Sequence, residues 1–229
     1  CGSQSLRRTE SEEGSLPSGA SRKMSTASAV IFGCGSTVLS EREKVFFRES
    51  NPFGFILFAR NIDNPDQVRS LVSELRDAVG RIDAPVLIDQ EGGRVARLRP
   101  PHWKERPAVR RFGDLYDRNP QSALDALSLN YSLIGAELAA LGIDVDCAPV
   151  CDVPVPGAHD IIGDRALGND PAMIAELGEA VIAGLLAGGV MPKAVRTVTG
   201  MSWRLGASPV IGRLENSTPG TLSCAMQWS

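Results

Sequence analysis

The sequence predicts an α/β fold in which buried parallel strands alternate with amphipathic helices. Two observations support this class. Short, continuous apolar runs typical of fully buried strands recur along the chain, and the segments between them carry apolar residues three or four positions apart, as on one face of a helix. Strands and helices that alternate in this way form a parallel sheet through right-handed connections. The pattern alone is compatible with a (β/α)8 barrel and with an open doubly wound sheet.

The strands are identified by their apolar runs and by the turn residues that follow them. They are expected at residues 29–35, 54–58, 85–88 and 143–153, with a further strand beginning at 190–191. The second run, GFILF, is continuous and apolar, which favours a strand buried on both faces. The fourth is expected to carry Asp152 at its C-terminal tip.

The helices are identified by their start and stop signals. They are expected from Ser40, from Asn64 to Gly80, from Leu124 to Leu141 and from Asp170 to Gly188. Ser40 and Glu43 have the spacing of a capping box, and Pro65 and Pro171 each follow a residue that commonly caps a helix. Gly80 stands where a C-cap is expected.

A long connection is expected between Arg94 and Gln121. It contains several prolines, with Trp103 and Phe112 between them. Connections of this length are uncommon in a compact domain unless they contribute to function. We interpret it as a wall of a ligand site, with an ordinary surface excursion as the alternative.

The stretch LIDQEGGRVARLRPP, residues 87–101, carries the strongest functional signal. Asp89 leaves the sheet at the carboxyl end of a strand, where α/β folds bind their ligands. Gly92 and Gly93 permit close approaches that a side chain would block. The alternative is a surface turn with a salt-bridged charge cluster.

The string DQEGGRVARL resembles the signature of glycoside hydrolase family 3, in particular its single-domain β-N-acetylhexosaminidases. Three further stretches resemble motifs of that family in the same order: GFILFARNI at 54–62, the run 100–113, and IIGDRALG at 161–168. The resemblance covers roughly Ala29 to Pro192. It implies a (β/α)8 TIM barrel, of which this chain carries about the first four to five strand–helix units.

The resemblance also implies a reaction. It is the retaining hydrolysis of terminal non-reducing N-acetyl-β-glucosaminyl residues, with an Asp nucleophile and a His acid/base. After Pro192 the sequence contains neither the family's motif with the acid/base His nor the one with the nucleophilic Asp. Lys193 lies near the position of a lysine in the family's motif, but no His follows it. No catalytic residue is therefore assigned, and the chain as written is expected to be inactive. His102 and His159 are interpreted as loop residues.

Substrate binding is what the resemblance assigns to this chain, through Asp89, Arg97 and Arg165. Asp89 is an acceptor-only carboxylate suited to sugar hydroxyls. The two arginines are fork-shaped donors suited to hydroxyl and carbonyl oxygens. Salt bridges to nearby acids are the alternative, and they are compatible with binding because a paired arginine is already oriented.

Four residues are secondary candidates for the site: Asp152, Trp103, Glu91 and Arg94. Glu91 and Arg94 are expected to hold the loop rather than to contact the sugar. For Trp103, stacking on a sugar face and anchoring the loop remain as two interpretations.

Composition narrows the class of protein. The chain has 229 residues, 43% hydrophobic and 22% charged, with a formal net charge of −3, which is ordinary for a globular domain and argues against a general nucleic-acid binder. No apolar run approaches the ~20 residues needed to span a bilayer. No metal and no cofactor are expected. Five cysteines without a C-x-x-C pair fit reduced thiols and a cytoplasmic location.

Three segments are expected: a disordered extension at 1–23, the N-terminal part of the barrel domain at 24–192, and an aberrant tail at 193–229. The tail has no sustained helical or strand periodicity, so we interpret it as frameshifted sequence. The expected partner is an N-acetylglucosamine-containing saccharide or muropeptide, in peptidoglycan recycling; no oligomeric state is predicted. The alternative functions are a non-catalytic sugar-binding or non-functional remnant, and a β-glucosidase-type member of the same family.

Overall fold

The computed structural model describes residues 26–154 and 161–194, which form one parallel five-stranded sheet. The strands are β1 (Ser28–Phe32), β2 (Pro52–Leu57), β3 (Val86–Ile88), β4 (Val145–Asp146) and β5 (Met191–Pro192). Their order in the sheet is β1-β2-β3-β4-β5, so each strand pairs with the one before it in the chain. A doubly wound sheet reverses its strand order at a switch point. The sequential order therefore confirms the α/β class and corresponds to consecutive strands of a barrel.

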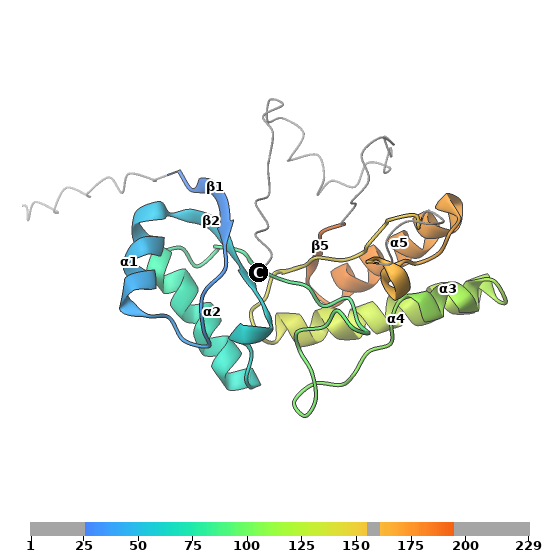
Figure 1. Ribbon diagram of the computed structural model, residues 1–229, viewed down its shortest axis with the longest axis horizontal. Coiled ribbons are helices and arrows are strands. Elements are labelled where there is room, and N and C mark those ends of the chain that lie inside the picture. Colours follow the sequence, from blue (N-terminus) through green and yellow to red (C-terminus); the bar gives the residue numbers. More distant parts are fainter. Residues whose placement is uncertain (1–25, 155–160, 195–229) are drawn as a thin grey trace, which may run out of the picture.

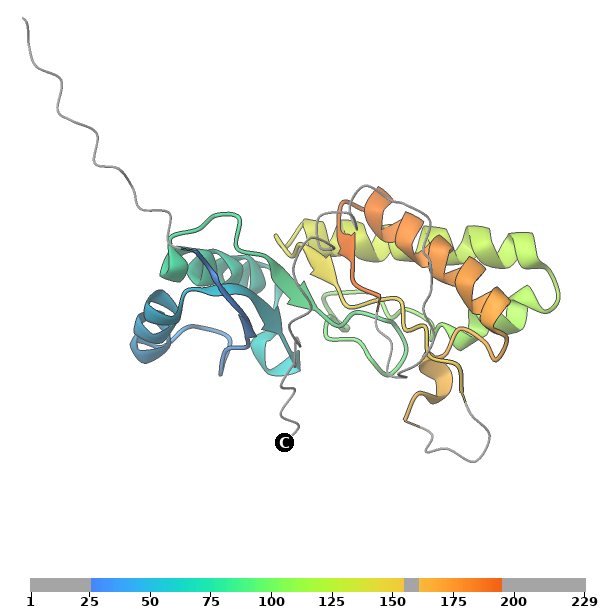
Figure 2. The same cartoon turned by 90° about the horizontal axis from the view of Figure 1, so that it is seen from above.

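The helices lie in two groups beside this sheet. They are α1 (Glu41–Ser50), α2 (Pro65–Val79), α3 (Arg110–Tyr116), α4 (Pro120–Ala139) and α5 (Pro171–Ala187), with short 3-10 turns η1 (Ala59–Asn61) and η2 (Gly163–Arg165). Helices α1 and α2 lie beside β1 and β2, and α4 and α5 lie toward β5 (Figure 1). Seen from above, α4 and α5 run side by side along their length (Figure 2). No helix in the described part of the chain combines the length and apolar composition needed to cross a bilayer.

The predicted helix starts are confirmed by the capping geometry. Ser40 and Glu43 form a capping box at α1. The side chains of Asn64 and Asp170 accept hydrogen bonds from backbone N–H groups in the first turns of α2 and α5. Gly80 ends α2 at φ 63°, a left-handed conformation that glycine adopts without strain.

Several boundaries differ from prediction. Strand β1 ends at Phe32 instead of Gly35, and β2 begins at Pro52 instead of Gly54. Strand β4 ends at Asp146 instead of Val153, because the N–H of Cys147 donates to Ile88, the last residue of β3, and β3 offers no partner beyond it. The long connection contains α3, which begins at Arg110. The preceding Val109 makes no side-chain cap and so leaves no start signal in the sequence. Helix α4 starts at Pro120, capped by Asn119. The predicted extension at 1–23, His159 and residues 195–229 of the predicted tail at 193–229 lie outside the described residues.

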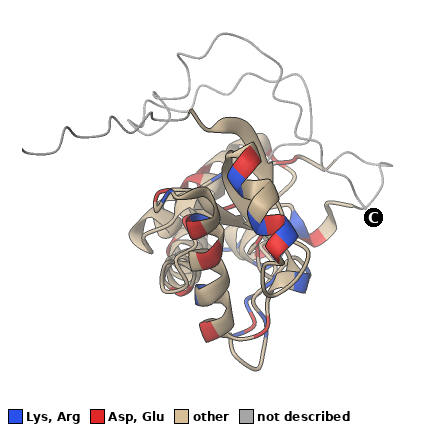
Figure 3. Cartoon of the chain, turned by 90° about the vertical axis from the view of Figure 1, so that its left-hand side faces the viewer, with Lys and Arg blue, Asp and Glu red and all other residues tan. Residues whose placement is uncertain are grey.

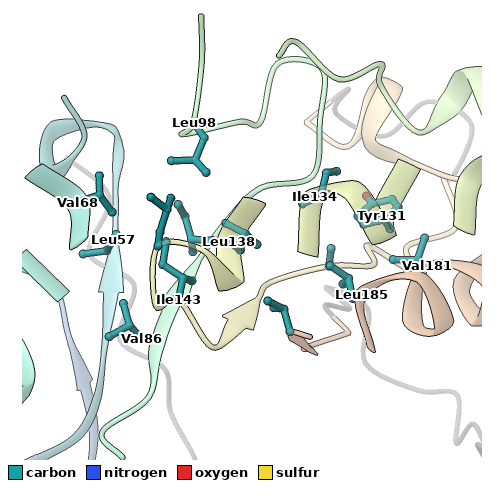
Figure 4. Close-up of a cluster of buried hydrophobic side chains, with 14 of the residues drawn as sticks. Leu57, Val68, Val86, Leu98, Tyr131, Ile134, Leu138, Ile143, Val181 and Leu185 are labelled. Atoms are coloured by element: carbon teal, nitrogen blue, oxygen red, sulfur yellow. The ribbon is translucent and has the colours of Figure 1, made fainter. Parts of the chain in front are cut away.

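One face of the sheet packs against the helices. Phe55 and Leu57 of β2 and Val86 and Ile88 of β3 are fully buried and belong to a single hydrophobic cluster. Figure 4 shows its side chains in a continuous row from α2 and β2, past β3, to α4 and α5. On the side that Figure 3 presents, acidic and basic residues are interspersed over the helices.

Helices α4 and α5 approach each other unusually closely. A Cβ added to Gly184 would lie 2.4 Å from the carbonyl oxygen of Ser128, and one added to Gly188 would lie 2.7 Å from the Cα of Gly135. Only glycine allows backbones to touch in this way. The contact fixes the spacing of the two helices that support β4 and β5.

Candidate functional site

The carboxyl ends of three strands place polar side chains on one face of the sheet. Leu87 of β3 pairs with Val145 of β4, and side chains two residues further along a strand point the same way. Asp89 and Cys147 are those residues. The backbone N–H of Lys193 continues the ladder with a 2.8 Å hydrogen bond to β4, which adds Lys193 to the same row. The sheet thus brings a carboxylate, a thiol and an ammonium group together at the carboxyl ends of its strands.

Asp89 is held by an arginine and a thiol. Its Oδ2 lies 2.7 Å from Nη2 of Arg97, and both side chains are about one quarter exposed, at 24% and 23%. The Cys147 thiol hydrogen bonds to Asp89, and burial, followed by the negative charge of Asp89, raises the pKa of Cys147 to about 12. A thiol with so high a pKa is a protonated donor and not a nucleophile. Asp89 is therefore oriented from two sides while still reaching solvent.

Glu91 and Arg165 form a bidentate ion pair. Nε of Arg165 lies 2.8 Å from Oε2 and Nη2 lies 2.7 Å from Oε1 of Glu91, which is 5% exposed. These hydrogen bonds raise the pKa of Arg165, and the charges of Asp89 and Asp152 add to the effect. Because Arg165 lies in η2, the ion pair holds the loop that contains η2 against the end of β3. The guanidinium edge not bonded to Glu91 keeps donors for a ligand.

Arg94 joins the same two loops further out. Its Nε lies 2.8 Å from Oδ1 of Asp164, and its Nη2 donates to the carbonyls of Ile161 at 2.7 Å and Ile162 at 3.0 Å. Both side chains of the pair are about half exposed. The geometry agrees with the expectation that Arg94 holds the loop.

The two remaining candidates lie deeper than the sequence indicated. Asp152 is 3% exposed and acts electrostatically on Arg165, but it follows β4 by several residues and is not at the strand tip. Trp103 is 9% exposed within the hydrophobic cluster, with the ring of His102 at 5.8 Å. This burial favours the anchoring interpretation of Trp103 over sugar stacking.

Two buried residues of the site were not predicted. Gln90 is 1% exposed, and its backbone N–H donates to Oδ1 of Asp146 at 2.9 Å. Asp146 is fully buried, and among the described residues its Oδ2 has no hydrogen-bond partner. Burial raises the pKa of Asp146 well above its usual range. Asp146 lies within the strand expected at 143–153 and is the last residue of β4, but no role in the site was predicted for it. The available signal was its distance of two residues from Asp144, which puts both on one side of a strand.

The arrangement suits a neutral, hydroxyl-rich ligand. A carboxylate accepts hydrogen bonds from hydroxyls, and two oriented guanidinium groups donate to oxygens. Across 26–154 and 161–194, no group of three or more His, Cys, Asp or Glu side chains is arranged to hold a metal ion. The site is therefore described by its hydrogen-bonding groups.

Known proteins resemble the chain over the same region. Residues 38–196 match the Glycosyl hydrolase family 3 N terminal domain. The β-hexosaminidase of Bordetella avium is 38% identical over 149 residues, 64% of this chain and 41% of that protein. The β-hexosaminidase of Nitrosomonas eutropha is 38% identical over 166 residues, 71% of this chain and 46% of that protein. The chain thus spans less than half the length of these curated relatives.

Solved structures give the same picture. Native NagZ from Neisseria gonorrhoeae is 29% identical, with a TM-score of 0.67 over 72% of this chain and 48% of that one. The same protein has been solved in complex with N-trifluoroacetyl-D-glucosamine, with a TM-score of 0.68 over 72% of this chain and 49% of that one. The match confirms that the sequential sheet is the fold of this family's N-terminal domain.

Proposed function

This chain belongs to glycosyl hydrolase family 3, and we propose that it forms the sugar-binding part of a β-N-acetylhexosaminidase. The observation that carries the proposal is the convergence of two arginine–carboxylate pairs at the end of β3. Arg97 lies eight residues from Asp89 in the chain, and Arg165 lies 74 residues from Glu91. A fold that brings Arg165 to Glu91 beside the partly exposed pair of Arg97 and Asp89 has built a polar site.

The proposed ligand is a terminal, non-reducing N-acetyl-β-glucosaminyl residue. Asp89 accepts hydrogen bonds from ring hydroxyls, while Arg97 and Arg165 donate to hydroxyl or carbonyl oxygens. A structural neighbour of 29% identity solved with N-trifluoroacetyl-D-glucosamine supports this sugar. We assign these residues to binding alone, since the retaining mechanism needs a nucleophile and an acid/base that no residue of this chain is assigned to supply.

The finer proposal is a muropeptide ligand and a role in cytoplasmic peptidoglycan recycling. It rests on the family resemblance and on the free thiols of Cys34, Cys147 and Cys151, which fit a reducing compartment. The division into an extension at 1–23, a domain at 24–192 and a frameshifted tail at 193–229 also remains a proposal. Sequencing the coding DNA tests the origin of the tail. If neither of the other two downstream reading frames encodes the family motifs, the frameshift hypothesis is contradicted.

Binding of methyl N-acetyl-β-glucosaminide by the full chain, measured by calorimetry, tests the function. We expect binding, and we expect Asp89→Asn to weaken it by about tenfold, the equivalent of about 1.4 kcal/mol. Asp66→Asn is the matched control, because Asp66 is 91% exposed on α2. A preference for methyl β-glucoside would favour the β-glucosidase alternative, and no binding of either sugar would favour a non-functional remnant.

Hydrolysis of a chromogenic N-acetyl-β-glucosaminide separates binding from catalysis. We expect no turnover by this chain, with an active β-hexosaminidase assayed in parallel as the positive control. Turnover by the chain would show that catalytic groups lie within its 229 residues and would overturn the assignment of binding alone.

A further inference from the structure

Gln90 makes an unusual set of hydrogen bonds with its side chain. Its Oε1 accepts from the backbone N–H of Arg97 at 2.8 Å and of Leu98 at 3.0 Å, and its Nε2 donates to the carbonyl of Leu98 at 3.1 Å. Two N–H donors and one carbonyl acceptor fix which end of the amide is oxygen. The side chain therefore takes the place of a neighbouring strand for residues 97 and 98.

The geometry of the loop explains why these side-chain hydrogen bonds of Gln90, which we call the Gln90 bracket, are needed. The chain reverses after β3, where the N–H groups of Glu91 and Gly92 both donate to the carbonyl of Val95. It then runs back past the strand end with Leu98 only 1% exposed. Buried backbone groups must be hydrogen-bonded, and none of the described strands pairs with residues 97 and 98. Gln90 satisfies them, and its own backbone is tied to β4 through Asp146.

Arg97 depends on this bracket for its position. Its guanidinium reaches Asp89 through Nη2, while its Nε is buried with no hydrogen-bond partner among the described residues. The side chain is thus fixed at its tip by Asp89 and at its backbone by Gln90. Without the backbone anchor, the ion pair alone has to hold a long, flexible side chain.

We propose that Gln90 is the positioning residue that holds Arg97 against Asp89 in the sugar site. The proposal deepens the proposed function and rests on it for the identity of the ligand. Gln90 is only 1% exposed, and it acts through the backbone of Arg97 and Leu98. Only a group that accepts two N–H bonds and donates one can do this, which an ionised carboxylate cannot and a protonated carboxyl can.

The test is Gln90→Glu in the full chain, read by amide hydrogen exchange of Arg97 and Leu98 at high and low pH. At high pH the ionised Glu would face the carbonyl of Leu98 and the nearby acids Asp89, Glu91 and Asp146. The carboxylate cannot donate to the carbonyl of Leu98 and is repelled by it, which moves the acceptor away from the two N–H groups. We expect the protection factors of both amides to fall by about tenfold. At low pH the neutral Glu should restore them. Gln90→Met should lose protection at every pH.

Gln67→Glu is the matched control. Gln67 makes the same kind of bracket, accepting from the N–H of Asp63 at 2.9 Å and donating to the carbonyls of Thr37 at 2.7 Å and Asn61 at 3.1 Å. It should leave the protection of residues 97 and 98 unchanged. Unchanged protection in Gln90→Glu at high pH, or an equal loss in Gln67→Glu, would overturn the proposal.

Sugar binding separates this proposal from the proposed function. Gln90→Glu should bind methyl N-acetyl-β-glucosaminide about tenfold more weakly at high pH and recover at low pH, relative to the unmodified chain at each pH. If the unmodified chain does not bind the sugar, the proposed function fails while the exchange data still decide whether Gln90 positions Arg97. If Gln90→Glu loses amide protection as expected but binds the sugar as tightly as the unmodified chain, Gln90 has only a structural role.

Discussion

The acids at the two ends of β4 differ in their exposure and in their hydrogen bonding. At the amino end, Oδ2 of Asp144 accepts from Nη2 of Arg76 at 2.8 Å and from the N–H of Val86 at 2.7 Å, and the side chain is 44% exposed. At the carboxyl end, Asp146 is fully buried and one of its oxygens has no partner among the described residues. These residues are two positions apart, yet only the first is well solvated and well paired.

The difference separates stability from function in this sheet. At the amino end a strong cation and a backbone donor hold an accessible carboxylate, which stabilises the fold at little desolvation cost. At the carboxyl end, buried polar groups crowd around Asp89 with unmatched atoms, which lowers stability and is typical of binding sites. Polar groups at the carboxyl ends of barrel strands serve ligands, and those at the amino ends serve the fold.

Breaking the pair at the carboxyl end should have the largest effect. Glu91→Gln leaves the Arg165 guanidinium, 21% exposed, without its counter-charge, and we expect the free energy of unfolding to fall by about 2–3 kcal/mol. Sugar affinity should fall as well, because Arg165 loses its orientation. Denaturant titration and calorimetry measure the two effects, with the exposed Glu41→Gln as control. A drop in stability with full affinity would place Arg165 outside the site.

At the amino end, a similar deletion should affect stability alone. Arg76→Met removes donors to Asp144 and to the carbonyl of Gly142, and we expect a loss of about 1–2 kcal/mol in the free energy of unfolding. Sugar binding, measured where both proteins are folded, should be unchanged. Weakened binding by the folded variant would contradict the division between the two ends.

The smallest effect should come from Asp146→Asn, and it should depend on pH. The pKa of Asp146 is raised in the folded state by burial. The folded protein therefore keeps a proton that the unfolded chain has lost, so this residue lowers the free energy of unfolding as pH rises above the ordinary Asp pKa of about 3.9. Asparagine is neutral at every pH and should remove that decline. Thermal unfolding from acid to neutral pH should show a gap between the two proteins that widens with pH. A constant gap would show that Asp146 is ionised in the fold.

Local chemistry made much of the fold predictable from the sequence. The capping box at Ser40, the Asn64 cap and the Gly80 C-cap act within a few residues, so their signals are visible in the chain. Helix α3 was not predicted because it has no cap and is stabilised by burial of Phe112 and its neighbours. The early end of β4 depends on where the adjacent strands stop offering partners, which no local pattern reveals.

Some residues of the site could likewise be predicted from the sequence, and others could not. Asp89 was expected at the site from its position at a strand end, and Arg97 and Arg165 from the family resemblance. The structure brings all three to the end of β3, and their binding role remains a proposal. Gln90 was missed because its amide is uncharged and its partners are backbone atoms, whose positions follow from the turn after β3. Asp146 was missed because its burial depends on packing around the whole strand end.

The sequential strand order has a consequence for how the protein is made. Every strand of the described sheet pairs with the one synthesised just before it, so no strand–helix unit waits for a later one. Pairing between consecutive strands keeps the sequence separations shorter than pairing with more distant strands would. The order of translation can thus be the order of assembly, with each new unit adding to the edge left by its predecessor as it leaves the ribosome.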